Sequence, residues 1–265
     1  MRSNRYAPTI EDVIEISGIE ILHPGGVALT KRTAEVADLK TGLKVLDVSS
    51  GRGTQSLFYA KQYGVDVTGI DILEEMVRTA TRRTKEAGLD NKVNFRIGDS
   101  QNLPFEDNTF DVVINECAVG IPDDPQKVLD EALRVLKIKG RIVIHESTWL
   151  KQLPVSEKEE IADRGGTTPF ELREWIGMLE RAGAKNIVYE LEQWSKPEMF
   201  YQIRENRKVE NMNSIMSFPE KMKTMARIYL KYGMKGIKNS TENGRIISKA
   251  VYKGKLGYCL FKGEK

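Results

Sequence analysis

Short runs rich in Val and Ile alternate with helical stretches from residue 43 to residue 146. The five runs are LKVLDV (43–48), VDVTGI (65–70), KVNFRI (92–97), FDVVIN (110–115) and GRIVIHE (140–146). Gly, Asp or Asn bounds them, as is typical of β-strands. The stretches between them, TQSLFYAKQY, LEEMVRTATRRTKEAG and DPQKVLDEALRVLK, favour helices. This alternation predicts a doubly wound α/β fold, with helices on both faces of a mostly parallel sheet and ligands at the carboxyl ends of its strands.

The flanking segments complete the predicted sheet. TIEDVIEI and VALTKRTAEVADL favour two helices before the first strand, and TPFELREWIGMLERAG favours a helix capped by Thr168 after the fifth. KNIVYELEQW predicts a sixth strand and LGYCLFKG an antiparallel last strand. We therefore expect a seven-stranded sheet with a helical insert between strands 6 and 7. The predicted core covers 1–195 and 256–265, with a helical cover over 1–40, and the insert covers 196–255.

Positive charge is concentrated in the last quarter of the chain. Residues 196–265 contain 16 Lys and Arg against 6 Asp and Glu, whereas the rest contains 25 against 32. Six of the nine Met residues lie in 197–255. The insert is thus predicted to be basic and Met-rich, acting as a substrate lid or contacting the core. An anionic ligand or a membrane surface would suit it.

Composition excludes several classes of protein. We find no apolar stretch of about 18 residues, and MRSNRYAPTIEDVIE lacks an apolar signal core, so a cytoplasmic location is expected. The two cysteines, Cys117 and Cys259, fit a reducing compartment. Scattered cysteines and histidines form no recognisable zinc motif, so no metal is expected.

The stretch VLDVSSGRGTQS (45–56) predicts a buried strand followed by a ligand-binding loop. Gly51 and Gly53 would let a ligand approach the backbone, and the free N–H groups of the next helix attract anions. GRGTQS is a weak match to the dinucleotide pattern G-x-G-x-x-G, because Ser56 stands at the third Gly. Asp47 precedes the glycines, where it would repel a pyrophosphate and suit a ligand that bears an ammonium group.

Two further acids follow the next two predicted strands. Asp71 ends VTGIDI, where a carboxylate can accept hydrogen bonds from both ribose hydroxyls. Asp99 lies in RIGDSQNLPF, where it can accept a hydrogen bond from an adenine amino group. Three acids at three successive strand ends indicate a ligand with an amino group, a ribose and an adenine but no phosphate. S-adenosylmethionine fits this description, whereas NAD and ATP do not.

In this order, the motifs resemble the class I, Rossmann-like S-adenosylmethionine-dependent methyltransferases. VLDVSSGRG resembles their first motif, GIDI the acid after their second strand, and GDSQNLPFEDNTFDVVINE their adenine loop and fourth strand. DEALRVLKIKGRIVIHE resembles the helix and strand that follow. The resemblance covers residues 27–150 and extends loosely to the C-terminal strand. More narrowly, LHPGG and GYCLFKG resemble small-molecule methyltransferases of the ubiquinone/menaquinone and arsenite methylase group.

The resemblance implies where the cofactor binds and which product it leaves, S-adenosylhomocysteine. The first loop lines the methionine half, the second acid holds the ribose, and the third acid holds the adenine edge. The residues implied to bind the cofactor are Asp47, Ser49, Gly51, Gly53, Gln55, Asp71, Ile72, Asp99, Ser100 and Asn115. Two positions depart from the family pattern. Ser49 stands where Gly is usual, which a small residue tolerates unless positive φ is required, and LKIKG replaces a distal LKPGG turn.

Residues acting on the methyl acceptor should lie near the ends of the fourth and fifth strands. A base is needed only if the acceptor loses a proton. Because side chains alternate along a strand, only one of His145 and Glu146 should face the site, and the resemblance favours Glu146. His23, in the HPGG loop, is a third candidate. The residues predicted to contact the substrate are Glu116, Cys117, Trp149, Met222 and Tyr229.

Three functions remain open from the sequence. The first is methylation of a small metabolite, apolar or anionic, by in-line displacement. Nucleic-acid methylation is less favoured, because NECA, and not an NPPY-like motif, follows the fourth strand, and no RNA-binding module is recognisable. The third is a non-catalytic S-adenosylmethionine-binding or regulatory protein.

Overall fold

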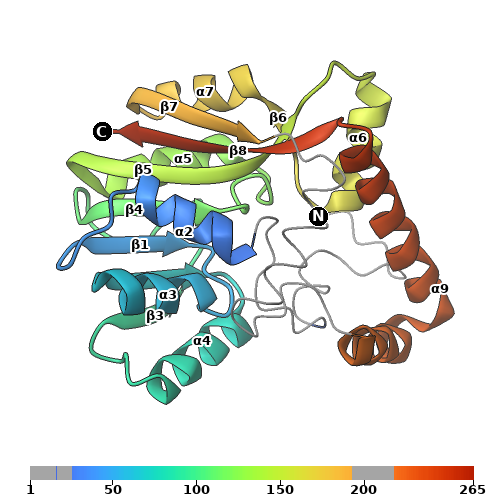
Figure 1. Cartoon of the computed structure of the whole chain (residues 1–265), viewed down its shortest axis with the longest axis horizontal. Coiled ribbons are helices and arrows are strands. Elements are labelled where there is room, and N and C mark those ends of the chain that lie inside the picture. The colour runs from blue at the N-terminus through green and yellow to red at the C-terminus, as the bar shows by residue number, and fades with distance from the viewer. Residues whose placement is uncertain (1–15, 17–25, 193–217) are drawn as a thin grey trace. The chain divides into compact units, whose positions relative to one another are not determined.

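The computed structural model describes residue 16 and residues 26–192 and 218–265 (Figure 1). The first predicted helix and the HPGG loop with His23 lie almost wholly outside these residues. The described chain forms two compact units. The sheet unit comprises Ala28–Thr148, Pro169–Glu192 and Tyr258–Lys265, and the helical unit comprises the remaining described residues, chiefly Trp149–Thr168 and 218–257. The helical unit thus includes residues 149–168, which the sequence prediction left with the core.

The sheet has the strand order β3-β2-β1-β4-β5-β8-β7 (Figure 1). Its strands are β1 (Lys44–Val48), β2 (Asp66–Asp71), β3 (Val93–Ile97), β4 (Phe110–Glu116), β5 (Leu136–Trp149), β7 (Lys185–Glu192) and β8 (Leu256–Glu264). The first five pair in parallel, and β7 pairs antiparallel with β8. The predicted architecture is confirmed, and β6 (Phe170–Glu171), which pairs with β5, adds a short eighth strand.

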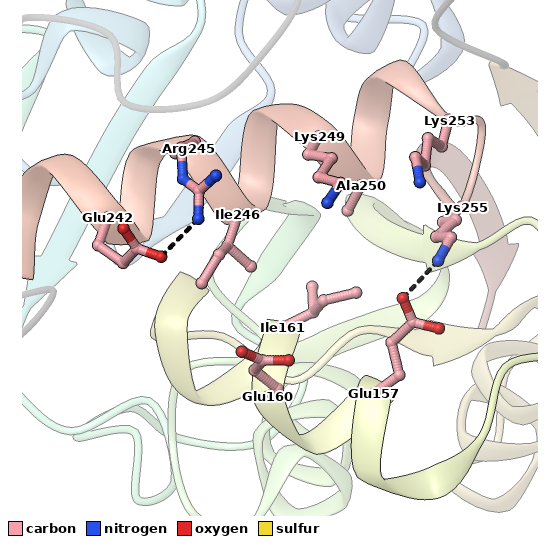
Figure 2. Close-up of a pocket in the computed structure, with 10 residues that line it drawn as sticks. All are labelled: Glu157, Glu160, Ile161, Glu242, Arg245, Ile246, Lys249, Ala250, Lys253 and Lys255. Atoms are coloured by element: carbon pink, nitrogen blue, oxygen red, sulfur yellow. Dashed lines mark hydrogen bonds and ion pairs between the residues drawn. The ribbon is translucent and has the colours of Figure 1, made fainter.

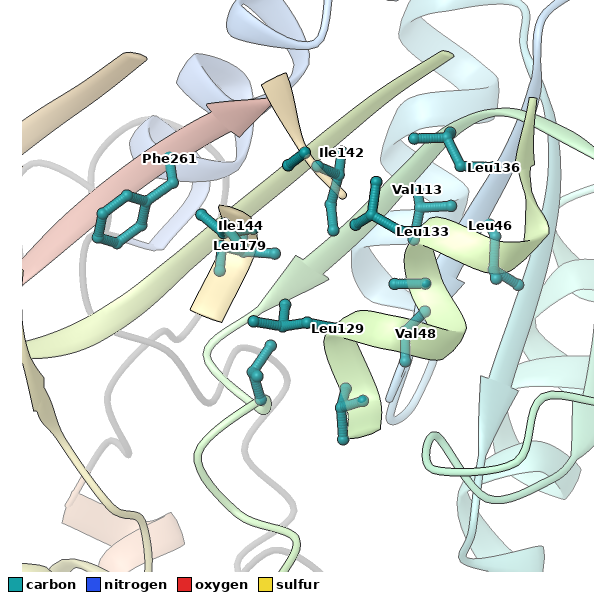
Figure 3. Close-up of a cluster of buried hydrophobic side chains, with 14 of the residues drawn as sticks. Leu46, Val48, Val113, Leu129, Leu133, Leu136, Ile142, Ile144, Leu179 and Phe261 are labelled. Carbon is teal, nitrogen blue, oxygen red and sulfur yellow. The ribbon is translucent and has the colours of Figure 1, made fainter. Parts of the chain in front are cut away.

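Alternating side chains divide the core into two layers on opposite faces of the sheet. Figure 3 shows the layer in which Leu46, Val48 and Val113 pack with Leu129 and Leu133. These two leucines belong to α5 (Pro125–Val135), and α7 (Leu172–Arg181) contributes to the same layer. The other layer joins the sheet to α2 (Gly26–Val36) and α3 (Thr54–Tyr63). Burying apolar side chains on both faces explains why the central strands are nearly continuous Val, Ile and Leu runs.

The start of α7 differs from the sequence prediction. Thr168 was expected to cap this helix, but the helix begins at Leu172 and is capped by a capping box of Glu171 and Glu174. The backbone N–H of Glu171 donates to Glu174 Oε2 at 2.7 Å. The prediction was wrong because Phe170 and Glu171 first pair with β5 as β6, which delays the helix.

In the helical unit, α6 (Val155–Gly165) packs against α9 (Phe218–Tyr252). The path of α9 breaks at Gly233, whose φ is 66°. A cavity of about 230 Å³ lies between the two helices, with charged walls and two ion pairs, Glu157–Lys255 and Glu242–Arg245 (Figure 2). Among the described residues, no helix combines the length and apolarity needed to cross a bilayer.

Candidate active site

The loop after β1 turns through three residues with positive φ: Ser49 (60°), Gly51 (53°) and Gly53 (74°). The two glycines serve different purposes. A Cβ on Gly53 would come within 2.5 Å of the Phe95 ring on β3, so Gly53 is required for packing. A Cβ on Gly51 would meet no described atom within 4 Å, which leaves open space beside the backbone. Only Gly51 therefore has the free surroundings that a bound ligand needs.

The helix that follows this loop has a polar and open N-terminus. Its N-cap is Gly53, which has no side chain to satisfy the first N–H groups of α3. Asp47 is 2% exposed, and its Oδ2 accepts a hydrogen bond from Ser56 Oγ at 2.5 Å. The Arg83 guanidinium, from α4 (Glu74–Glu86), donates to Arg52 O at 3.2 Å and to Thr54 Oγ1 at 3.0 Å. The first turn of α3 is thus fixed from both sides, with its amides available to an anionic group.

Asp71, at the end of β2, connects two segments of the site. Its Oδ2 accepts from the N–H of Gly51 at 2.8 Å, and its Oδ1 accepts from the N–H of Leu73 at 2.9 Å. Burial raises the pKa of Asp71, while these backbone hydrogen bonds act in the opposite direction. The next residue, Ile72, is 61% exposed, so an apolar surface adjoins a carboxylate that is already held in place.

The loop after β3 is ordered by its own side chains. Asp99 Oδ1 accepts from the N–H of Gln101 at 2.8 Å, and Ser100 between them is 9% exposed. Gln101 Oε1 in turn accepts from the N–H of Asp124, the N-cap of α5, at 3.2 Å. These contacts hold Asp99 at the same edge of the sheet as Asp47 and Asp71, since β1, β2 and β3 are parallel neighbours.

At the end of β4, Asn115 holds the start of the next loop. It is 3% exposed, and its Oδ1 accepts from the N–H of Ala118 at 3.0 Å. Its Nδ2 is buried without a hydrogen-bond partner among the described residues. Leaving a buried donor unsatisfied costs about 1–3 kcal/mol. A polar ligand at this end of β4 would remove that cost.

The Glu116 carboxylate is held from two helices. Tyr59 of α3, which is completely buried, donates its hydroxyl to Oε1, and Thr30 of α2 donates to Oε2 at 2.9 Å. Burial raises the pKa of Tyr59, and the Glu116 charge adds to that effect. Glu116 therefore connects α2 and α3 to β4, on the face of the sheet opposite Asn115.

His145 and Glu146 are both fully buried, on opposite faces of β5. Glu146 Oε1 accepts from the N–H of Val119 at 2.7 Å, while Oε2 has no partner among the described residues. Burial raises the pKa of Glu146 to about 8, against the effect of several loop amides. At neutral pH the carboxyl is thus mostly protonated, and it anchors the loop that Asn115 begins.

The other predicted substrate residues lie in different surroundings. Cys117, at φ 65°, is half-buried beside Tyr258 and Glu146, and burial raises the pKa of its thiol. Trp149 is 7% exposed, with the Lys158 ammonium 5.9 Å from its ring centroid. Met222 and Tyr229 are 55% and 52% exposed. The structure therefore brings Cys117 and Glu116 to the end of β4, whereas Trp149, Met222 and Tyr229 belong to the helical unit.

A methyltransferase domain model matches residues 39–196, which is more than half of the chain and includes every strand end described above. The chain belongs to this family. Its cofactor is therefore S-adenosylmethionine. Among the described residues of this methyltransferase, no group of three or more His, Cys, Asp or Glu is placed to hold a metal ion.

Curated relatives support the assignment. The chain is 40% identical over 148 residues to the demethylmenaquinone methyltransferase of Paenarthrobacter aurescens, covering 55% of this chain and 56% of that protein. It is 28% identical over 175 residues to phosphoethanolamine N-methyltransferase 1 of Arabidopsis thaliana, covering 66% and 35%. The matched region thus spans about half of the first relative and a third of the second.

Solved structures share the fold at low sequence identity. The phosphoethanolamine N-methyltransferase 2 of Haemonchus contortus, in complex with S-adenosyl-L-methionine, matches with a TM-score of 0.72 and 20% identity, over 95% of this chain and 55% of that one. The [4+2]-cyclase SpnF matches with a TM-score of 0.76 and 22% identity, over 99% of both chains. Because one neighbour is described as a cyclase, the fold alone does not identify the reaction.

Sequence reasoning missed the side chains that support the site. Thr30, Tyr59 and Arg83 fix Glu116 and the first loop, and Phe95 explains Gly53. No local motif marks them, because each acts across 20 or more residues of sequence. The buried Tyr on the inner face of α3 was the one visible signal, since a buried phenol needs a hydrogen-bond partner.

Proposed function

We propose that the methyltransferase holds S-adenosylmethionine along the carboxyl ends of β1 to β4 and transfers its methyl group to a small metabolite. The observation that carries this proposal is the set of three acids at one edge of the sheet, together with the open backbone of Gly51. The first loop and the uncapped start of α3, with Gln55, suit the carboxylate of the methionine half. Asp47 supplies negative charge for its ammonium group.

The nucleoside half fits the next two strand ends. The Asp71 oxygens accept backbone hydrogen bonds, among them those from Gly51 and Leu73, and the carboxylate keeps acceptor capacity for the ribose hydroxyls. Exposed Ile72 offers an apolar surface for one adenine face, and Asp99 with Ser100 offers acceptors and donors for its edge. Asn115 Nδ2 supplies a donor beside β4. Ser49 and Gly53 shape the loop but need not contact the cofactor.

When bound, S-adenosylmethionine supplies an electrophilic methyl group, so the chain mainly has to align the acceptor and exclude water. Glu146 is the best-placed candidate base, but with a pKa of about 8 it holds a proton at neutral pH. We infer that its main role is to position the loop after β4. Only the small fraction of molecules in which Glu146 is ionised can accept a proton. His145 and His23 remain weaker candidates.

The acceptor is proposed to be apolar or anionic. The basic helical unit favours an anionic group, and the exposed Met residues of α9 favour an apolar one. The names of the relatives, a demethylmenaquinone and a phosphoethanolamine methyltransferase, include both kinds. Glu116, Cys117 and Trp149 remain the proposed substrate contacts, and 196–255 the proposed substrate lid. Met222 and Tyr229, also expected to contact the substrate, are about half exposed and suit an outward contact of that lid better.

Calorimetry with Asp71→Asn tests the cofactor site. Losing hydrogen bonds to a charged group should weaken binding of S-adenosylhomocysteine by about 10- to 100-fold, with NAD and ATP failing to bind the wild type. Asp66→Asn is the matched control, because Asp66 lies at the opposite end of β2 in a half-exposed pair with Lys92. Unchanged affinity in Asp71→Asn would contradict the proposed ribose contact.

A search by mass spectrometry tests the acceptor. A metabolite extract incubated with enzyme and S-adenosylmethionine should yield a product heavier by one CH₂ group, formed in step with S-adenosylhomocysteine. Purified RNA and DNA serve as competing acceptors. Methylated nucleic acid would refute the small-molecule proposal, and tight cofactor binding without turnover in any mixture would indicate a non-catalytic protein.

A further inference from the structure

The first half of α9 exposes a continuous apolar stripe. Met222, Met225, Tyr229 and Leu230 are 55%, 40%, 52% and 83% exposed. At 3.6 residues per turn they lie within an arc of about 140° on one side of the helix. We refer to these four residues as the α9 stripe. Large apolar side chains that are exposed together on one face indicate an interaction surface, whereas single exposed ones do not.

The stripe is not the face by which α9 packs on its own unit. Thr224 and Ile228, which are 4% and 3% exposed, are the buried residues of this half of the helix and lie on its opposite side. Arg227 donates to the backbone carbonyl of Ile16 at 3.0 Å, which fixes the rotation of the helix. The orientation of the stripe is therefore set by contacts that leave it outward.

Positive charge borders the stripe. Lys223, Arg227 and Lys231 are exposed and follow one edge of the stripe around the helix. Over the whole of α9, eight Lys and Arg accompany only two Glu. The helix therefore carries a net charge of +6, eight basic minus two acidic residues, beside its apolar stripe. It is complementary to a surface that is negative and needs no fixed shape.

We propose that the α9 stripe docks on an anionic lipid surface. The Met, Tyr and Leu side chains would enter the boundary between headgroups and acyl chains, while the lysines keep their ammonium groups among the lipid phosphates. The two methionines of the stripe suit a fluid surface, because their side chains adapt to irregular apolar surroundings. Docking requires neither the cofactor nor a methyl acceptor.

Vesicle flotation tests this proposal without any turnover. The full chain should bind phosphatidylcholine vesicles that contain phosphatidylserine, and should bind phosphatidylcholine alone much more weakly. Binding should fall as salt rises, since salt screens the charge attraction. Each lysine removed in Lys223→Gln/Lys231→Gln should weaken binding about fivefold. The matched control is Lys61→Gln/Lys85→Gln, which removes two exposed lysines from the sheet unit.

A second pair of variants tests the apolar contact. Leu230→Ser should weaken vesicle binding by roughly tenfold, because a buried leucine side chain is lost from the boundary. Ile138→Ser, at a residue 68% exposed on β5, should leave binding unchanged. Light scattering reports the oligomeric state of each variant. Three results would overturn the proposal. The protein does not bind vesicles, its binding is unchanged in both sets of α9 variants, or it forms a dimer that Leu230→Ser dissociates.

Discussion

At the carboxyl edge of the sheet, carboxylates are buried and surrounded by backbone amides, whereas on α9 apolar side chains are exposed and bordered by lysines. Asp47 and Glu146 are 2% and 0% exposed, yet Met222 and Leu230 are 55% and 83% exposed. Both arrangements cost free energy in an isolated chain, since burial disfavours charge and water disfavours apolar surface. The two arrangements suit different ligands: the sheet edge offers hydrogen-bond acceptors to a polar cofactor, and α9 offers an apolar face with a basic border to a negatively charged surface.

The largest expected effect compares one leucine from each region. Leu129→Ala should destabilise the protein by about 2–5 kcal/mol, because Leu129 is fully buried between α5 and the sheet. Leu230→Ala should change stability by less than about 0.5 kcal/mol, because Leu230 is 83% exposed. Urea unfolding measures both. A large loss of stability in Leu230→Ala would show that the stripe is packed in solution and would remove the contrast between the regions.

Glu146→Gln should change how stability depends on pH. The pKa of Glu146 rises from the ordinary 4.5 to about 8 on folding. Between these values the folded protein keeps a proton that the unfolded chain releases. The stabilisation that this bound proton provides is therefore complete below pH 4.5 and is lost as the pH rises through 8. Each pH unit in that window should cost up to about 1.4 kcal/mol in the wild type.

The glutamine variant removes this dependence while keeping an acceptor for Val119. It should match the wild type near pH 5 and exceed its stability above pH 8, as measured by urea unfolding across the range. Glu106→Gln is the control, because Glu106 is an exposed loop residue, and the stability of this variant should depend on pH as that of the wild type does. Parallel pH profiles for Glu146→Gln and the wild type would show that Glu146 is not a protonated anchor.

The sheet and the cofactor loops were predictable because their signals are local. The first four strands are runs of five to seven residues that contain Val or Ile, and Asp47, Asp71 and Asp99 lie at or near the ends of three of them. The helical unit was harder. VSEKEEIADRG forms α6 although Ile161 is its single buried apolar residue, so its helix has almost no hydrophobic pattern.

The rotation of α9 could not be read from periodicity. Met222, Met225 and Tyr229 form the more apolar face, which favoured a lid or a core contact, yet they are 40–55% exposed whereas Thr224 and Ile228 are buried. The periodicity of apolar residues identifies a face of a helix but does not identify what packs against that face. In the same way, the role of Gly53 depends on Phe95, which is 42 residues away and carries no motif.

The smallest expected effect concerns Ser49, where the sequence departs from its family. The residue has a φ of 60°, so positive φ is indeed required there. Left-handed backbone costs about 1–2 kcal/mol for a residue with a Cβ, whereas glycine adopts it freely. Part of that gain is offset because glycine also gives the unfolded chain more freedom. Ser49→Gly should therefore stabilise the protein by about 0.5–1 kcal/mol.

Lys139→Gly provides the matched control, because Lys139 has a φ of 65° near the start of β5, far from the first loop. Both variants should gain stability in thermal unfolding, and both should bind S-adenosylhomocysteine as the wild type does, since Ser49 shapes the loop only through its backbone. Ser49→Val should lose both stability and affinity, because a β-branched residue tolerates positive φ poorly. If Ser49→Gly alone weakened binding, the hydroxyl of Ser49 would contact the cofactor, and the departure from glycine would be functional.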